Sequence, residues 1–400
     1  CALPISAPVA YSNYIGFRSP ATRTMRSKAF IILMLLVFQA AAHAASPLEE
    51  LYQAALTRDV PPGHYVYNWR DAVLLKSLTD LYRTTPDKQA EIAAYIAGEM
   101  ERVAPKAHGA HPNGIASAVG FAFLKETGRA TPATDKALAR VLEQYERIPR
   151  TADGACSHRT DRVELWDDTL YMLEIAFLGC YKATGDKKFL DLAVRETLLH
   201  AQRLMDPKSG LWYHGWSESG LPVEDNCCQF GWNANPLHRS SEFWGRGNGW
   251  IAMTLADLLE YLPSTDARYP ALREMFRKMM KRLRCRQDRK TGLWYQLPNR
   301  PKDKGNYLES SCTAMFGYAA LKGARLGLLP ACYRKVGEKA WKGITVHCLE
   351  KGDDGIHLTR ICPGTCIGDK AYYYGRGTVS RGETYALGAT LLLANEMENY

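Results

Sequence analysis

The chain has 400 residues, a formal charge of +9 and 10% aromatic residues. The excess charge is modest, and the basic residues are scattered apart from a cluster between Arg277 and Arg289. That cluster lacks the interleaved aromatic residues of a single-stranded nucleic-acid site, so it indicates the solvent-exposed face of a helix and argues against a nucleic-acid partner. The cysteines and histidines of the whole chain show no paired spacing typical of a zinc site, so we expect no bound metal.

The N-terminal segment has the pattern of a secretory signal. Two basic residues follow Met25, an apolar stretch covers 29–42, and Ala42-His43-Ala44 fits the small-x-small cleavage pattern. The stretch is shorter than the roughly 20 residues of a membrane span, so we expect cleavage, a periplasmic or secreted protein, and no membrane attachment afterwards. The predicted segments are upstream non-native sequence at 1–24, a signal peptide at 25–44 and a single catalytic domain at 45–400.

Apolar residues recur with helical periodicity through nearly all of the chain beyond the signal. Several helices end at clear stop signals, such as Gly185 and Pro263. The pattern predicts twelve helices, at about 47–57, 67–84, 87–104, 113–127, 133–147, 167–184, 187–204, 245–261, 267–286, 307–326, 331–349 and 381–397.

Between the helices there is a weak internal repeat. The segment from Asp206 to Tyr213 is echoed from Asp288 to Tyr295, and each predicts a turn followed by a short strand. Helical hairpins that repeat must stack on one another to bury their apolar faces. Six such hairpins can close into an all-α (α/α)6 barrel, and the alternative is an open α-solenoid. We expect closure, because the polar and aromatic segments sit at helix starts and loops, where a ring brings them together.

Three aromatic, polar-rich segments carry the residues for chemistry. They are Trp166–Met172, Tyr213–Trp216 and Glu242–Trp250. Together they supply an acid for proton transfer, an imidazole, an arginine that can pair with a carboxylate, and flat side chains for sugar faces. This combination is typical of a pocket for a charged sugar.

Each candidate also has a structural interpretation. One of Asp167 and Asp168 is expected to cap a helix, whereas two adjacent carboxyls exceed what a cap needs. His214 is either a hydrogen-bonded structural histidine or a functional one. Arg246 lies between glycines that allow close approach of a ligand, and its alternative is a buried salt bridge, for example to Glu242.

These segments resemble glycoside hydrolase family 105, the unsaturated rhamnogalacturonyl hydrolases, which are related to the unsaturated glucuronyl hydrolases of family 88. Two further segments, Tyr307–Met315 and Cys362–Thr365, share the likeness. The resemblance implies an (α/α)6 barrel without a cofactor. It implies removal of a 4,5-unsaturated uronic acid from the non-reducing end of lyase-generated oligosaccharides, by protonation of the enol ether and addition of water at C5.

The resemblance also implies roles for individual residues. Asp168 matches the catalytic aspartate, which leaves Asp167 as the helix cap. His214 matches a histidine near the acid and the substrate, Arg246 the arginine that faces the uronate, and Trp244 and Trp250 the pocket walls.

One segment departs from the family pattern. Many members carry a second pocket aspartate where this chain reads Ala110-His-Pro-Asn-Gly114. We expect Asn113 or His111 to take its place in substrate binding.

Two other functions remain as alternatives. A conventional inverting glycosidase on the same barrel needs a second carboxylate about 6.5–9.5 Å from the first, and Glu242 and Glu309 are the candidates. A secreted sugar-binding protein would keep the aromatic pocket without chemistry. The retention of an acid, a histidine and an arginine together argues against such a binder.

Overall fold

A computed structural model describes residues 45–220 and 237–400. The predicted signal peptide at 25–44 and the segment 1–24 lie outside the described residues. The unit that carries the fold is Pro47–Tyr400. In the described part of the chain, no helix combines the length and the apolar character needed to cross a membrane.

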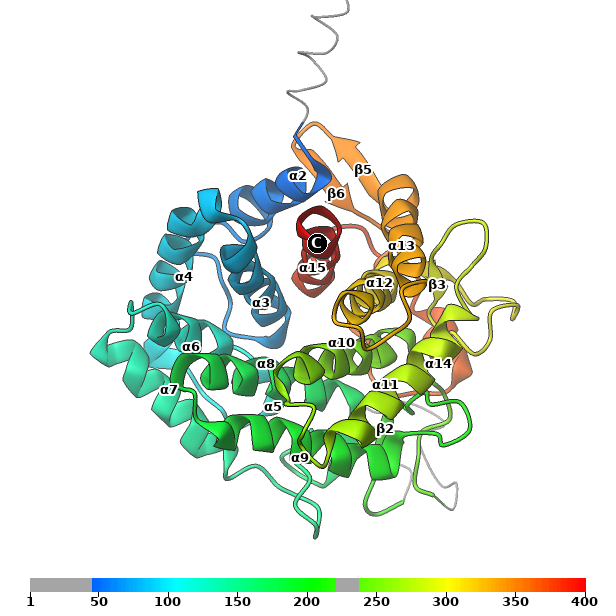
Figure 1. Ribbon diagram of the computed structural model, residues 1–400, viewed down its shortest axis with the longest axis horizontal. Helices are drawn as coiled ribbons and strands as arrows, with labels where there is room; N and C mark the ends of the chain where they lie inside the picture. Colours follow the sequence, from blue (N-terminus) through cyan, green and yellow to red (C-terminus); the bar gives the residue numbers. More distant parts are fainter. Residues whose placement is uncertain (1–44, 221–236) are drawn as a thin grey trace, which may run out of the picture. The chain divides into compact units, whose positions relative to one another are not determined.

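Six helices form an inner ring in chain order. Each contacts the next one, and the last contacts the first, so the ring is closed (Figure 1). The inner helices are α3 (Trp69–Thr84), α6 (Ala118–Glu126), α8 (Asp167–Thr184), α10 (Gly245–Tyr261), α12 (Ser310–Arg325) and α15 (Thr384–Asn399).

Six more helices alternate with these along the chain and lie outside them (Figure 1). The outer helices are α2 (Pro47–Ala54), α4 (Gln89–Val103), α7 (Pro132–Tyr145), α9 (Lys187–Leu204), α11 (Tyr269–Arg284) and α13 (Tyr333–His347). The predicted (α/α)6 barrel is therefore confirmed, and the open solenoid is excluded.

The two rings differ in burial because they face different surroundings. Every residue of α10 from Gly245 to Leu259 is buried, as expected for a helix enclosed on all sides. In α11 the buried residues are Leu272, Phe276, Met279, Met280 and Leu283, which recur every three or four positions on one face.

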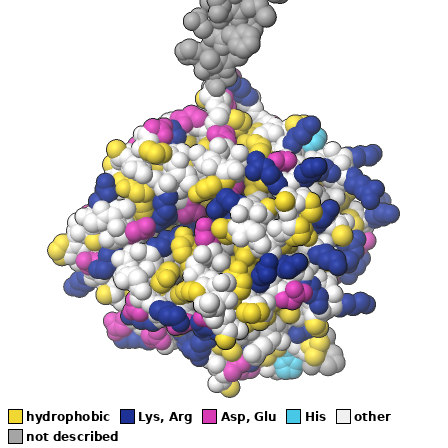
Figure 2. Space-filling model, in the orientation of Figure 1, with side chains coloured by type: hydrophobic (Ala, Val, Ile, Leu, Met, Phe, Trp, Pro, Cys, Tyr) yellow, Lys and Arg dark blue, Asp and Glu magenta, His cyan; other side chains and the backbone are white. Residues whose placement is uncertain are grey.

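The basic residues of α11 occupy the opposite, solvent-facing side, and Arg277, Lys281 and Arg284 are exposed. Figure 2 shows Lys and Arg side chains gathered on the side of the molecule where α11 and α13 lie. The prediction of a solvated helix face is confirmed.

The internal repeat is structural. Asp206 and Asp288 open equivalent turns, in which their backbone N–H groups donate to Leu211 O at 2.8 Å and Leu293 O at 2.9 Å. Gly210 and Gly292 have φ of 76° and 81°, a left-handed conformation that favours glycine. Each turn directs a buried tryptophan, Trp212 or Trp294, into the core.

Short strands connect the helices as three antiparallel pairs within the described residues. They are β1 (Glu164–Trp166) with β2 (Gly215–Ser217), β3 (Trp294–Tyr295) with β4 (Leu308–Glu309), and β5 (Leu349–Gly352) with β6 (Gly355–Leu358). The remaining short helical elements are η1 (Ala55–Asp59), η2 (Pro86–Lys88), η3 (Ala104–Lys106), α5 (Pro112–Ile115) and α14 (Lys370–Gly375).

Candidate active site

The pairing of β1 with β2 brings two of the sequence motifs together. Trp166, the last residue of β1, lies opposite Gly215. The next residue, Asp167, begins α8, and its backbone N–H donates to His214 O at 3.0 Å. The acid pair and the histidine, 46 positions apart from Asp168 to His214, are therefore neighbours in space.

Asp168 is held by two side chains from other elements. Its Oδ2 lies 3.1 Å from His214 Nε2, and its Oδ1 accepts a hydrogen bond of 3.1 Å from Trp250 Nε1. His214 Nδ1 lies 2.8 Å from the hydroxyl of Tyr373 in α14. If that hydroxyl donates to Nδ1, the proton of the neutral imidazole is on Nε2 and points at Asp168.

These contacts decide the charge of Asp168. Burial raises the pKa of the carboxyl, but the hydrogen bond and charge of His214 outweigh burial and bring the pKa to about 2. Burial in turn lowers the pKa of His214, and the contact with Asp168 opposes that effect. At neutral pH the resting site therefore holds an ionised Asp168.

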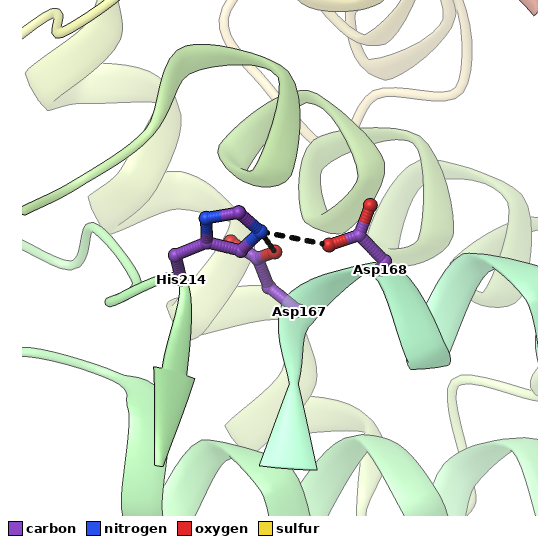
Figure 3. A group of neighbouring side chains, drawn as sticks. All are labelled: Asp167, Asp168 and His214. Atoms are coloured by element: carbon purple, nitrogen blue, oxygen red, sulfur yellow. Dashed lines mark hydrogen bonds and ion pairs between the residues drawn. The ribbon is translucent and has the colours of Figure 1, made fainter. Parts of the chain in front are cut away.

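Asp167 does not have the capping role predicted for it. Trp166 is the N-cap residue of α8, and no side chain caps this end of the helix. Asp167 is fully buried, and neither carboxyl oxygen has a hydrogen-bond partner. Figure 3 shows its carboxyl beside the His214 imidazole, where Oδ1 lies 4.0 Å from Nε2. The prediction failed because β1 leads directly into the helix and turns this side chain inward.

Asp168 opens onto a cavity of about 630 Å³. The cavity lies at the N-terminal ends of α3, α5 and α8, and a loop after Cys362 closes one side. It is lined by Trp69, Arg70, His111, Asn113, His158, Arg159, Thr160, Asp161, Trp166, Asp168, Met172, Gly364, Thr365 and Cys366. Two predicted substrate-binding residues, His111 and Asn113, are thus in the lining.

His111 is held in a fixed orientation. Its Nδ1 accepts a hydrogen bond of 3.1 Å from the backbone N–H of Asn113, and its ring meets His158 edge-on. Burial and the nearby charge of Arg159 lower the pKa of His111 to about 4. It is therefore a neutral hydrogen-bonding group at neutral pH.

The tryptophans of the cavity wall are not those predicted. Trp69 and Trp166 line the cavity, and Trp166 stacks on His158 with ring centroids 4.5 Å apart. Trp244 and Trp250 are fully buried outside the lining. Trp244 stacks on His214 at 4.3 Å, and Trp250 donates to Asp168. They contact the acid and the histidine from behind and do not face the cavity, because α10 is enclosed on all sides.

Arg246 also lies behind the site rather than in it. Its side chain is 1% exposed, its NH1 group donates to Cys362 O at 2.5 Å, and its NH2 group donates to Pro363 O at 2.8 Å. The guanidinium lies over the rings of Trp244 and Tyr385. In this structure it holds the loop that closes the cavity and, contrary to the prediction, does not line the cavity itself.

The two glutamates proposed for a conventional glycosidase are engaged elsewhere. Glu242 accepts from Arg300 at 2.7 and 2.9 Å, which also replaces the salt bridge suggested between Glu242 and Arg246. Glu309 caps α12 by accepting from the N–H groups of Ser311 and Cys312. Neither residue lines the cavity.

One group of donor atoms among the described residues is close enough to surround a cation. The donor atoms of Asp167, Asp168 and His214 all lie within 4.8 Å of one another. Within this group His214 Nε2 and Asp168 Oδ2 are already in contact at 3.1 Å. The described cysteines are free thiols.

Sequence reasoning missed several lining residues. Arg70 directly follows Trp69 at the start of α3, and His158 with Arg159 lies in the loop before β1. Asn68 caps α3 immediately before Trp69, so this segment begins a helix. The segments around Asp168 and Arg246 also begin helices. That signal was available from the sequence. The loop around His158 carries no comparable pattern.

Comparison with known proteins agrees with this fold. The profile of Glycosyl Hydrolase Family 88 matches residues 52–400. The unsaturated rhamnogalacturonyl hydrolase YesR of Bacillus subtilis is 24% identical over 340 residues, which cover 82% of this chain and 88% of that protein.

Two solved structures show the same architecture. A family 105 glycoside hydrolase from C. acetobutylicum superposes with a TM-score of 0.76 at 27% identity, covering 89% of this chain and all of that one. The unsaturated glucuronyl hydrolase of Bacillus sp. GL1 gives a TM-score of 0.61 at 16% identity, covering 88% of this chain and 93% of that one, and shares the fold. This chain belongs to Glycosyl Hydrolase Family 88 and, with its family 105 relatives, is an unsaturated uronyl hydrolase.

Proposed function

We propose that the protein removes a 4,5-unsaturated uronic acid from the non-reducing end of lyase-generated oligosaccharides. The observation that carries the proposal is the position of Asp168, which faces a cavity that also holds Arg70, Arg159 and two tryptophans. The acid suits proton transfer, the arginines suit a carboxylate, and the tryptophans suit the faces of sugar rings.

The proposed reaction uses Asp168 first as an acid and then as a base. The carboxylic acid gives its proton to C4 of the enol ether, and the positive charge develops at C5 and the ring oxygen. Water adds at C5 and returns one proton to Asp168. The resulting hemiketal opens and releases the remaining sugar. His214 and Trp250 orient the two oxygens of Asp168 for these steps.

Arg70 is the residue that we propose for recognition of the uronate carboxylate. Its side chain is 41% exposed and forms an ion pair with Glu383 at 3.0 Å. This ion pair holds the guanidinium in place at the cavity. A Cβ built on Gly364 would lie 2.8 Å from the guanidinium, so a small residue is needed at that point of the loop. Arg159 is already paired with Asp161 at 3.0 Å and adds positive charge nearby.

We expect Arg70→Gln to raise the Michaelis constant for an unsaturated uronide about tenfold and to change kcat little. Losing one hydrogen bond between charged groups costs about 1.5–3 kcal/mol, and the partial exposure of Arg70 favours the lower end. Steady-state kinetics measures the change. Arg147→Gln is the matched control, because it removes an exposed arginine that pairs only with Glu143 on the surface. An unchanged Michaelis constant in Arg70→Gln would assign the carboxylate to another group.

The function is tested with a matched pair of substrates in a buffer that contains EDTA. We expect the protein to remove the ultraviolet absorbance of an unsaturated disaccharide made by a polysaccharide lyase. A saturated aryl glucuronide should not be cleaved, because it has no enol ether to protonate. Cleavage of only the saturated substrate would support the conventional glycosidase, and tight binding without turnover would support a sugar-binding protein. Loss of activity through EDTA would show that a metal is needed.

We also propose that the protein acts in the periplasm or outside the cell, on the basis of the pattern at 25–44. The N-terminal residue of the protein recovered from those fractions tests this, with Ala45 expected.

A further inference from the structure

Asp167 is a second carboxyl in the active centre with no structural contact that accounts for it. It is fully buried, and both of its oxygens lack a hydrogen-bond partner. A Cβ built on Gly247 would lie 2.1 Å from Oδ2 and 2.5 Å from Oδ1, so the backbone of α10 packs directly against this carboxyl. A buried polar group without a partner costs stability, and no contact within the fold accounts for a carboxyl at this position.

The ionisable groups around Asp167 come from all the elements packed against it. Asp168 is the next residue of α8, His214 precedes β2, Arg246 is on α10 and Tyr373 is on α14. Burial, then the negative charge of Asp168 and a contact with its side chain raise the pKa of Asp167 well above its usual range, and the backbone of Asp168 and the charge of Arg246 oppose this effect only in part. A proton shared by the pair therefore resides on Asp167 and not on Asp168, whose pKa is lowered.

That distribution is the reverse of what the first step of the proposed reaction needs. The step requires a proton on Asp168, which His214 keeps ionised. The chain has no carboxylate in the segment Ala110–Gly114, which lines the cavity with His111 and Asn113 instead. Asp167 supplies a second carboxyl from a different position, directly beside the first.

We propose that Asp167 stores the proton that Asp168 delivers to the substrate and passes it directly to its neighbour. This inference rests on the proposed function. The donor atoms of Asp167, Asp168 and His214 lie within 4.8 Å of one another, with His214 Nε2 3.1 Å from Asp168 Oδ2 and 4.0 Å from Asp167 Oδ1, so the two carboxyls are neighbours beside one imidazole (Figure 3).

The transfer conserves protons at every step. Asp167 gives its proton to the neighbouring Asp168 carboxylate, while the proton on His214 Nε2 stays on the imidazole. Asp168 then protonates C4 and, as a carboxylate, accepts a proton from the attacking water. The reverse transfer from Asp168 returns the proton to Asp167. Tyr373, which lies 2.8 Å from Nδ1, keeps the other ring nitrogen engaged throughout.

The pH dependence of Asp167→Asn tests the proposal against a purely structural role. Storage on Asp167 requires the pair to keep one proton up to neutral pH in the wild type, so the proposal expects kcat to stay nearly level between about pH 4.5 and 7. In Asp167→Asn the protonated fraction of Asp168 should fall about tenfold for each pH unit, and kcat with it. A structural residue would lower kcat by the same factor at every pH, and parallel profiles would overturn the proposal.

A second measurement does not depend on the substrate. The infrared difference spectrum between wild type and Asp167→Asn at neutral pH should contain the C=O stretch of a protonated carboxylic acid. Its absence would overturn proton storage even if the enzyme is active. If the band is present and no unsaturated uronide is turned over, the proposed function fails while storage stands.

Folding of the variants is checked by thermal unfolding. The folded protein holds the Asp167 proton more tightly than the unfolded chain does, so Asp167 costs stability as pH rises above the ordinary pKa of an aspartate. We therefore expect Asp167→Asn to be at least as stable as the wild type at neutral pH. Asp167→Val, which also cannot hold a proton, should show the same slope of kcat with pH. A level profile in the valine variant would overturn the proposal as well.

Discussion

Asp168→Asn is expected to lower kcat on an unsaturated uronide by roughly 10²–10⁴-fold, because that is the usual contribution of general acid–base catalysis. Asparagine keeps nearly the same shape and can still accept the hydrogen bond of Trp250, which is 3.1 Å long in the wild type. The fold should therefore survive, and the loss should appear in kcat. The measurement is the rate of loss of the enol-ether absorbance at saturating substrate.

Asp161→Asn is the matched control for this variant. Asp161 lines the same cavity, but its carboxylate pairs with Arg159 and Arg162 and is 56% exposed. We expect its kcat to stay within a few-fold of the wild type. Comparable losses in both variants, or near-normal turnover in Asp168→Asn, would show that the acid is another residue.

The loss in Asp168→Asn should hold at every pH, unlike that in Asp167→Asn. In Asp167→Asn, lowering the pH can restore the protonated form of Asp168, because only the neighbouring carboxyl that stores the proton is missing. It cannot restore a proton donor that has been replaced. The two variants therefore separate the group that reacts from the group that supplies it.

The helical architecture could be predicted because its signals are local. The inner and outer helices follow apolar periodicity, and turns such as Gly185, with φ of 69° at the end of α8, are marked by glycine. Closure into a ring follows from the stacking of repeated hairpins. The short α14 was missed, because six residues are too few to show a period.

The site was predicted only in part, because its details depend on which side of a helix start faces the cavity. Asp168 was found from its motif, and its contact with His214 depends on the pairing of β1 and β2, which involves only three residues in each strand. Trp244, Arg246 and Trp250 lie in the correct region but behind the surface. A motif gives the neighbourhood of a side chain, and whether the side chain is exposed depends on packing from distant helices.

Beyond the active site, the inner ring encloses a network of charged side chains. Asp257 on α10 is 1% exposed and accepts hydrogen bonds of 2.7 Å from Lys322 Nζ and 2.6 Å from the hydroxyl of Tyr318. Lys76 Nζ on α3 lies 3.2 Å from its other oxygen, Oδ2. Burial raises the pKa of Asp257, but the charges of Lys322 and Lys76 outweigh burial and lower it. A single carboxylate thus joins three of the six inner helices.

Asp257→Ala is expected to reduce the free energy of unfolding by about 3 kcal/mol, the lower end of the range for breaking a buried ion pair, because Lys76 keeps Asp80 and Lys322 keeps Glu260 as a partner. Lys76 and Lys322, with side chains 4% and 5% exposed, would lose their shared acceptor. Chemical denaturation at neutral pH measures the change. Glu338→Ala is the control, since its exposed pair with Arg334 on α13 should contribute at most about 1 kcal/mol.

The same network predicts how the difference between wild type and Asp257→Ala depends on pH. The folded protein binds the proton of Asp257 more weakly than the unfolded chain does, so this stabilisation is present above the ordinary pKa of an aspartate. It is lost as the pH falls through the lower pKa of the folded state. The difference in free energy of unfolding between wild type and Asp257→Ala should therefore become smaller at acidic pH. A gap that stays constant with pH would mean that packing around residue 257, and not its charge, joins the helices.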